Sequence, residues 1–469
     1  MRFILTLFFF IIAVLSQGQN KQLLYDIRSL PQSLMSNPGT NIAFDKHIGI
    51  PFLSQIHISA GTSGVNLYDI FNDSNPNVNE RVAKAISKLT SNDYFTAREQ
   101  FEILSFGWRL KNDDYLSMGL YQEMDVFAYF PKDPAILVNE GNNDYINVPF
   151  NFSHVSFTGE ALTVYHVGLN RKIDHKLTVG GRLKIYSGIF NVESTDNTGY
   201  FTTMNSPEGP NYYRHFADNI NVRVNTSGYK SVKDENKTVE EATADLLKRS
   251  FFFGGNIGVG VDLGATYKIE EHLIVTGSVQ DLGLMFHKKD VENYLYYGNY
   301  ETDGIEPLFP GAGPGGSTLP YWDIFEDEVD ENLKDETLTE AYITWRPYIL
   351  NASLEYGFGK FYQPCNYLIP VNRRAQNLVG IHLFGIKRPK GLKYAFNAYF
   401  DRKFTQNFRM KIAYTVDDFS NTNLGLLVST RLKNFNFYLA ADNLLGYFNL
   451  AKSNSESIQL GFQFVFKKY

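Results

Sequence analysis

Cysteine is almost absent from this chain of 469 residues. Its single cysteine, Cys365, has no second cysteine with which to pair. The fold therefore holds without an internal disulfide, and we interpret Cys365 as a structural loop residue.

Long hydrophobic runs are absent as well, except at the N-terminus. Arg2 is followed by the apolar run Phe3 to Leu15 and then by Ser16-Gln17-Gly18. This pattern predicts an export signal peptide over residues 1–18, which we leave out of the fold. No later run approaches the roughly 18 apolar residues that a membrane helix needs.

The residues of familiar active sites are also sparse. Net charge is −6 without a basic patch, which argues against nucleic acid as a partner. The nine histidines show no metal-binding spacing. Glu160, His166 and Asp174-His175 form a proton relay on paper, but no Gly-x-Ser-x-Gly setting accompanies them. We therefore predict that the protein has no catalytic, cofactor-binding or metal-binding residues and that it is not an enzyme.

Aromatic residues and glycine are abundant, with 38 Phe, 30 Tyr and 37 Gly, yet mean hydropathy is only −0.25. Alternation of polar and apolar residues along each strand explains how an aromatic-rich chain can have such a low mean hydropathy. From Ile458 to Phe466 every even-numbered residue is large and apolar, which is typical of the closing strand of a membrane β-barrel. A soluble edge strand would show the same nine-residue pattern, so the rest of the chain decides.

Similar alternation recurs along the whole chain. The predicted strands are 48–61, 99–110, 115–127, 155–169, 177–190, 251–268, 273–286, 347–359, 377–387, 391–402, 407–417, 421–432, 434–442 and 456–466. They predict an all-β fold, a transmembrane antiparallel β-barrel of about 14 strands.

Connections alternate between short and long, which predicts periplasmic turns, long extracellular loops and both termini in the periplasm. Two links break the rule: 360–376 is long, and Arg388-Pro-Lys390 is short. Residues 19–47, which precede the barrel at 48–469, form either a plug-like segment inside it or a periplasmic tail.

Charge follows the alternation. In 408–417 and 177–185, one face is apolar and the other carries Arg409, Lys411, Arg182 and Lys184. Arg or Lys facing mid-membrane lipid costs about 2–4 kcal/mol, so the charged face must be the inner one. The acids predicted to join these bases in the lumen are Glu160, Asp262 and Glu355. A lumen of mixed sign indicates a salt-bridged, filled interior.

Four other segments have distinctive patterns. Residues 323–336 hold eight carboxylates, which indicate either a Ca²⁺ collector or a solvated or partner-facing loop. Residues 311–316 lack the Lys-Ser/Thr of a phosphate loop and predict a flexible turn. Asn77 to Leu89 predicts a capped amphipathic helix, which either packs over the barrel mouth or docks another protein. Glycines 254, 255, 258, 260 and 264 allow something to pack closely against the inner wall.

Several short motifs resemble a known family. They are Ser36-Asn-Pro-Gly39, Gly260-Val-Asp-Leu-Gly264, Gln280-Asp-Leu-Gly283, Gly298 to Gly304 and Asp442-Asn-Leu-Leu-Gly446. Together they are similar to an uncharacterised family of Bacteroidota outer-membrane barrels, which in turn resembles the fatty-acid-transporter-type (FadL-like) barrels and the barrel subunits of type IX secretion. The resemblance implies fourteen strands with an N-terminal segment inside. Asn37-Pro38-Gly39 departs from the Asn-Pro-Ala of the transporter-like relatives.

Two functions are compatible with these patterns. The first is a non-enzymatic structural or accessory subunit of a larger outer-membrane complex, for secretion or barrel assembly, with protein partners docking on loops 62–98, 191–250 and 287–346. The alternative is a plugged-barrel transporter of a hydrophobic or small solute. Either way the surrounding partner is outer-membrane lipid, namely lipopolysaccharide and phospholipid.

Overall fold

A computed structural model describes residues 22–72, 76–207, 212–233, 239–303, 329, 331–362 and 374–466. The predicted signal peptide, residues 311–316, Cys365, most of 323–336 and the last three residues lie outside this part. No helix within the described ranges is long and apolar enough to cross a membrane.

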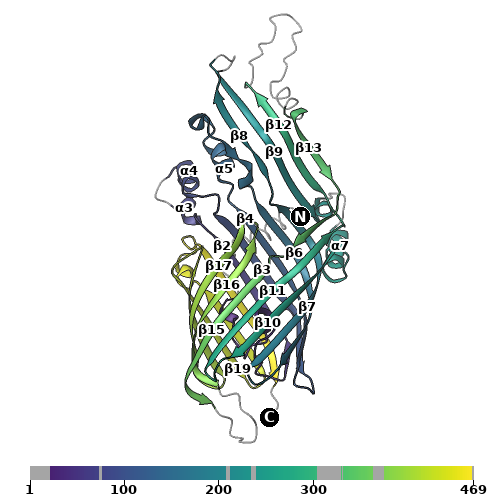
Figure 1. Cartoon of the computed structure of the whole chain (residues 1–469), viewed down its shortest axis with the longest axis vertical. Helices are drawn as coiled ribbons and strands as arrows, with labels where there is room; N and C mark the ends of the chain where they lie inside the picture. Colours follow the sequence, from purple (N-terminus) through teal and green to yellow (C-terminus); the bar gives the residue numbers. More distant parts are fainter. Residues whose placement is uncertain are drawn as a thin grey trace, which may run out of the picture.

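A closed antiparallel barrel of fourteen strands forms the body of the protein, as predicted (Figure 1). The strands are β1 (Lys46–Gly49) with β2 (Gln55–Thr62), β3 (Tyr94–Arg109), β4 (Tyr115–Tyr129), β6 (Phe157–Lys172), β7 (Leu177–Ser194), β10 (Asn256–Lys268), β11 (Leu273–His287), β15 (Ile349–Tyr362), β16 (Arg374–Arg388), β17 (Gly391–Lys403), β18 (Phe408–Asp417), β19 (Asn423–Leu432), β20 (Phe435–Asp442) and β21 (Ser455–Phe466). β21 closes the barrel on the first strand, with Ile58 opposite Ile458 and Lys46 opposite Phe466.

Every predicted strand has a counterpart in the structure, with ends that are shifted by up to five residues, and two of them differ for a clear physical reason. The first is split, because the chain turns between β1 and β2, where Leu53 N–H donates to Ile50 C=O at 3.0 Å. The strand predicted from 251 begins only at Asn256, since Phe251 ends helix α7 (Val239–Phe251). The N–H of Gly254 caps that helix by donating to Lys248 C=O at 3.0 Å. Glycines 254 and 255 therefore precede the strand that was predicted to contain them.

The barrel has a turn end and a loop end. At the turn end the connections are short, for example 173–176 and 269–272 between consecutive strands. The loop end carries α3 (Leu67–Phe71), α4 (Val78–Lys88) and α5 (Lys132–Asn139). The predicted helix is α4: Asn77 caps it, and Ala85, Ile86 and Leu89 are buried. The β16–β17 turn, which breaks the rule, is tight and lies at the loop end.

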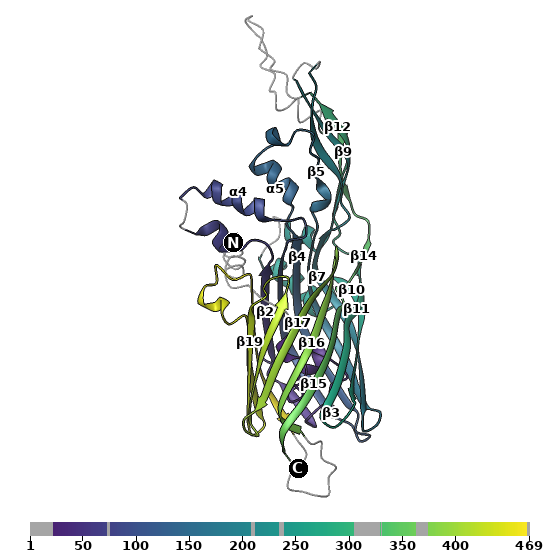
Figure 2. The same cartoon turned by 60° about the vertical axis from the view of Figure 1, so that its left-hand side comes forward.

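Two segments predicted to be long loops contain strands. β8 (Thr198–Asn205), β9 (Tyr213–Ser227), β12 (Asn293–Thr302) and β13 (Leu333–Leu338) form a sheet, and short β5 (Phe150–Asn151) joins β8. Figures 1 and 2 show this sheet standing beyond one side of the loop end. Because β9 pairs with β7 through Asn191 and Ser227, and β14 (Tyr342–Trp345) pairs with β11, the sheet continues the barrel wall.

Side chains alternate across the wall as predicted. Leu183 is 70% exposed on the outer face, whereas its neighbour Arg182 is 2% exposed inside. In β21 the outward residues Ile458 and Phe464 are exposed, and Gln459 and Gln463 are buried. Exposed apolar side chains on β7, β18 and β21 form a lipid-facing surface, which confirms the transmembrane barrel.

Residues 22–44, named the plug, lie inside the lumen. They include η1 (Gln22–Leu24) and α2 (Ser33–Ser36), and most of their side chains are buried. Leu23, Leu24, Ile27 and Leu30 pack in a cluster with Leu427 and Tyr438 on the wall. The plug-like segment is therefore confirmed against the alternative of a periplasmic tail.

Candidate functional site: the plug and the turn-end chamber

Hydrogen bonds from the wall hold the backbone of the plug. Asn170 Nδ2 donates to the carbonyls of Pro38 and Thr40 at 2.7 and 2.9 Å, and Ser278 Oγ donates to Ser36 C=O at 2.7 Å. Because α2 is only one turn long, these wall side chains satisfy carbonyls that a longer helix would satisfy internally. The plug thus depends on barrel side chains for its conformation.

Three glycines bring this part of the plug against the wall. A Cβ atom on Gly180 would lie 2.8 Å from the backbone nitrogen of Gly39, and one on Gly264 would lie 2.9 Å from the same atom. A Cβ on Gly39 would meet the backbone nitrogen of Ala265 at 2.6 Å. The close approach predicted at Gly264 is confirmed. The same lack of space favours glycine at position 39, directly after Pro38.

Charged groups of the plug have partners in the wall. Asp26 accepts from Ser353 Oγ at 2.6 Å and Tyr399 OH at 3.0 Å, Arg28 forms an ion pair with Glu355, and Lys411 Nζ donates to Tyr25 C=O at 2.8 Å. Buried charges are tolerated only when paired in this way.

A second ion network crosses the lumen between the plug and the loop end. Arg346, between β14 and β15, pairs with Glu123 on β4 at 2.9 Å and with Glu160 on β6. Arg388 at the end of β16 bonds Asp125 on β4, and Arg98 on β3 lies 3.6 Å from the same carboxylate. Since Arg346 and Arg388 come from the opposite side of the barrel, these ion pairs tie facing walls together.

A further pair of acids in the lumen shares one lysine. Lys184 Nζ is 2.8 Å from Asp262 Oδ1 and 2.7 Å from Asp281 Oδ1. Together with the ion pairs of Glu160 and Glu355, this confirms the predicted inward position of all three acids and the salt-bridged interior. Two voids in the lumen measure about 40 Å³ each, enough for ordered water but not for a solute.

The histidine relay considered from the sequence is not assembled. Glu160 bonds Arg346, and His166 is buried beside Tyr121. Asp174 and His175 lie in the turn at the far end of β6, where Asp174 accepts from the N–H groups of Leu177 and Lys176 and these bonds lower its pKa. Within the described ranges, no group of three or more His, Cys, Asp or Glu is arranged to hold a metal.

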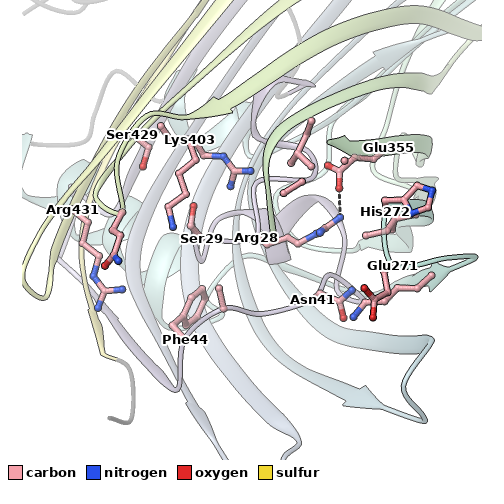
Figure 3. A pocket seen from close by; sticks show the side chains of 18 of the residues that line it. Arg28, Ser29, Asn41, Phe44, Glu271, His272, Glu355, Lys403, Ser429 and Arg431 are labelled. Carbon is pink, nitrogen blue, oxygen red and sulfur yellow. Dashed lines mark hydrogen bonds and ion pairs between the residues drawn. The ribbon is translucent and has the colours of Figure 1, made fainter. Parts of the chain in front are cut away.

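Beneath the plug, at the turn end, lies a chamber of about 430 Å³. Plug residues Arg28, Ser29, Asn41 and Phe44 form one side of it. The wall contributes side chains from β15, β17, β19 and the turn between β10 and β11, as Figure 3 shows for Glu355, Lys403, Arg431 and His272. The chamber is therefore bounded by the plug and by wall residues next to the short turns.

Comparison with known protein families assigns the chain to one of them. Residues 38–442 match a family described as "Family of unknown function (DUF5723)". The chain belongs to this family. The match to the DUF5723 family runs from the end of the plug to β20, so it includes most of the barrel. No curated protein sequence matches the chain.

Several solved structures are similar in fold to this DUF5723 protein. The Ralstonia pickettii toluene transporter TbuX is 11% identical over 93% of this chain and 94% of its own, with a TM-score of 0.40. A monoaromatic hydrocarbon channel, CymD, is 11% identical over 97% and 98%, with a TM-score of 0.42. A Pseudomonas aeruginosa FadL homologue is 10% identical over 96% of each chain, with a TM-score of 0.42. The predicted resemblance to FadL-like barrels is thus found, while Bacteroidota and type IX secretion stay predictions.

Proposed function

We propose that this protein is an outer-membrane transporter that passes a small solute when the plug shifts from its seat. One observation carries the proposal: the plug is a continuous part of the chain, seated in the lumen between the turn-end chamber and the ion network. Its displacement opens a path without the loss of any subunit. In this arrangement the turn end faces the periplasm, and lipopolysaccharide and phospholipid surround the apolar wall.

The contacts between the plug and the barrel wall favour a movable plug over a rigid core. Many of these contacts are hydrogen bonds from short side chains, such as Ser278 and Asn170, to plug carbonyls. Water can replace such bonds when the plug moves, so each contributes only about 0.5–1.5 kcal/mol net. The apolar cluster around Leu23 and Leu24 holds the other part of the plug and keeps the closed state populated.

Locking the plug tests the proposal directly. In a Cys365→Ser background, Ser36→Cys with Ser278→Cys joins plug and wall at a contact where the native side chain already reaches the backbone. Solute flux into reconstituted vesicles should be low when this pair is oxidised and return on reduction. Deleting residues 22–44 should raise flux above that of the intact protein.

Either of two outcomes would contradict transport. One is a barrel without its plug that leaks no more than the intact protein. The other is equal flux in the oxidised and reduced forms of the cysteine pair. The single variant Ser278→Cys in the same background controls for the loss of one hydrogen bond.

A second candidate function is that of an accessory subunit, and one surface favours it. Loops 63–93 and 443–454 contact each other through Asn66 and Asn454, whose side chains are 3.1 Å apart. They expose Phe71 (70%) and Phe448 (88%) beyond the barrel. Figure 2 shows α4 and the last loop projecting sideways from the loop end. Exposed aromatic side chains on two loops that contact each other suit a protein partner.

Purification in mild detergent tests this candidate. A stoichiometric partner retained by the native protein and lost from a Phe71→Ser/Phe448→Ser variant supports the subunit role. Recovery of the barrel alone from both speaks against it. Deletions in 191–250 or 287–346 extend the test to the other loops.

A further inference from the structure

We infer that the turn-end chamber is a binding site for a small multivalent anion bearing carboxylate or phosphate groups. As the place where a transported solute meets the plug, this site rests on the proposed transport function. As a binding site, it stands on the chemistry of its lining alone.

The lining carries more positive than negative charge. Seven Lys and Arg side chains and two His face three Glu. Arg28 is paired with Glu355, and Arg409 is paired with Asp401 at 2.6 Å outside the lining. Even when Asp401 is included, the described residues of the lining have a net charge of three positive with neutral histidines. A concave wall with charge of one sign concentrates ions of the other sign.

Two of the cations approach from separate strands. Figure 3 shows Lys403 of β17 and Arg431 of β19 directed into the chamber. Arg431 is held in place, because its Nε donates to Lys433 C=O at 2.7 Å and its Nη2 donates to Val465 C=O at 3.0 Å. These bonds hold the guanidinium at the chamber wall, where its positive charge is available to a carboxylate or phosphate group.

General membrane-edge chemistry does not account for these residues. Basic side chains at a membrane interface normally extend outward to lipid headgroups. Arg402 does so: it is on the outer face, 5.1 Å above the ring of Phe404. Lys403 is its neighbour in the chain but has the opposite parity and lines the chamber. The positive charge of the chamber is thus a property of the inner wall.

Size and position define the ligand further. About 430 Å³ lies within the usual range for pockets that hold one small molecule, roughly 300–1,000 Å³. Arg28, Ser29 and Asn41 belong to the plug, so a bound anion contacts plug and wall together. Several cations spread over one cavity suit several anionic groups on one solute, as in the Arg and Lys rings of anion pores.

Citrate and inorganic phosphate are suitable probes, with glucose and spermidine as neutral and cationic controls. Calorimetry on the purified, plug-containing protein at low salt should show citrate binding and no binding of glucose or spermidine. The Lys403→Gln/Arg431→Gln double variant should bind citrate at least about tenfold more weakly, since two close charges are lost. Arg402→Gln, which removes a cation from the outer face, should bind like the native protein.

Two further variants separate charge from folding. Arg431→Lys keeps the charge and should retain most of the affinity, whereas Lys403→Gln alone leaves the bonds of Arg431 intact and should lose part of it. Absence of citrate and phosphate binding in the native protein, or equal affinity in the double variant, would overturn the inference. Phosphatidylglycerol that competes with citrate would show a lipid headgroup, not a free solute, as the source of the anion.

Failure of this inference and failure of transport are distinguishable. Calorimetry needs no flux and is done with the plug seated. Citrate binding by the native protein, without solute flux through the plug-deleted barrel, would contradict the transport function and support the binding site. Flux that depends on the plug, without anion binding, would leave transport and remove the site.

Discussion

Arg346 and Glu123 meet across the lumen, with guanidinium Nη2 2.9 Å from carboxylate Oε1 and side chains that are 0% and 3% exposed. They come from the junction before β15 and from β4, which lie on opposite sides of the barrel. This ion pair, with its neighbours, joins two walls that share no backbone hydrogen bonds. It lies between the plug and the loop end, so it also narrows the lumen.

Replacing Arg346 with Leu should destabilise the barrel strongly. Glu160 and Glu123 would lose their shared partner in a buried setting, which costs about 3–5 kcal/mol. The free energy of unfolding of protein in vesicles, measured in guanidinium, reports this loss. Arg214→Leu is the control, since Arg214 pairs with Glu301 and Asp303 on the exposed loop-end sheet and its loss should change little. Equal stability of the native protein and the Arg346→Leu variant would show that the ion network is dispensable.

Substituting alanine for Gly180 should push the plug from the wall. The new Cβ would lie 2.8 Å from Gly39 N, which is backbone and cannot turn aside. Gly181, the next residue, faces outward, and its Cβ would meet Leu263 Cδ2 at 3.8 Å. Gly180→Ala should therefore raise permeability to small antibiotics in cells, and Gly181→Ala should not. Equal permeability of cells that carry the two variants would contradict the contact between the plug and Gly180.

Arginine placed on the outer face of β18 should have a cost that depends on depth. Ile412 is near the middle of the strand and Phe408 is at the turn end, and both are exposed. Ile412→Arg should lose about 2–4 kcal/mol and Phe408→Arg about 0–1 kcal/mol, because charge is expensive only in the hydrocarbon. Unfolding in vesicles measures both. A smaller loss at Ile412 than at Phe408 would mean that the lipid does not surround this strand as we assign it.

The last strand should be required for assembly. Phe466 is its final described residue and pairs with Lys46 at the point where the barrel closes. Phe466→Asp should reduce the amount of folded barrel in membranes, which heat-modifiable migration on gels reports. Removal of residues 467–469 should be tolerated. Normal assembly of the Phe466→Asp protein would show that this strand is not the assembly signal.

Much of the barrel was predictable because its information is local. A period of two assigns each side chain to lipid or lumen from its immediate neighbours. Alternation alone thus places Lys411 and Arg182 inside the barrel. The alternation from Ile458 to Phe466 likewise determined the closing strand. The alternation of short and long connections then indicated which end of each strand lies at the turn end. Fourteen strands and two distinct barrel ends therefore followed from the sequence.

Tertiary structure alone decided what the lumen contains. Arg28 and Glu355 are 327 positions apart in the chain, and no periodic pattern relates them. Their pairing depends on the diameter of the closed barrel and on the path of the plug. Arg346 was missed for the same reason, since it lies in a segment predicted to be a loop. The sequence determined which residues face inward, and the closed barrel decided which of them meet, because contacts across a lumen form only when the whole wall is in place.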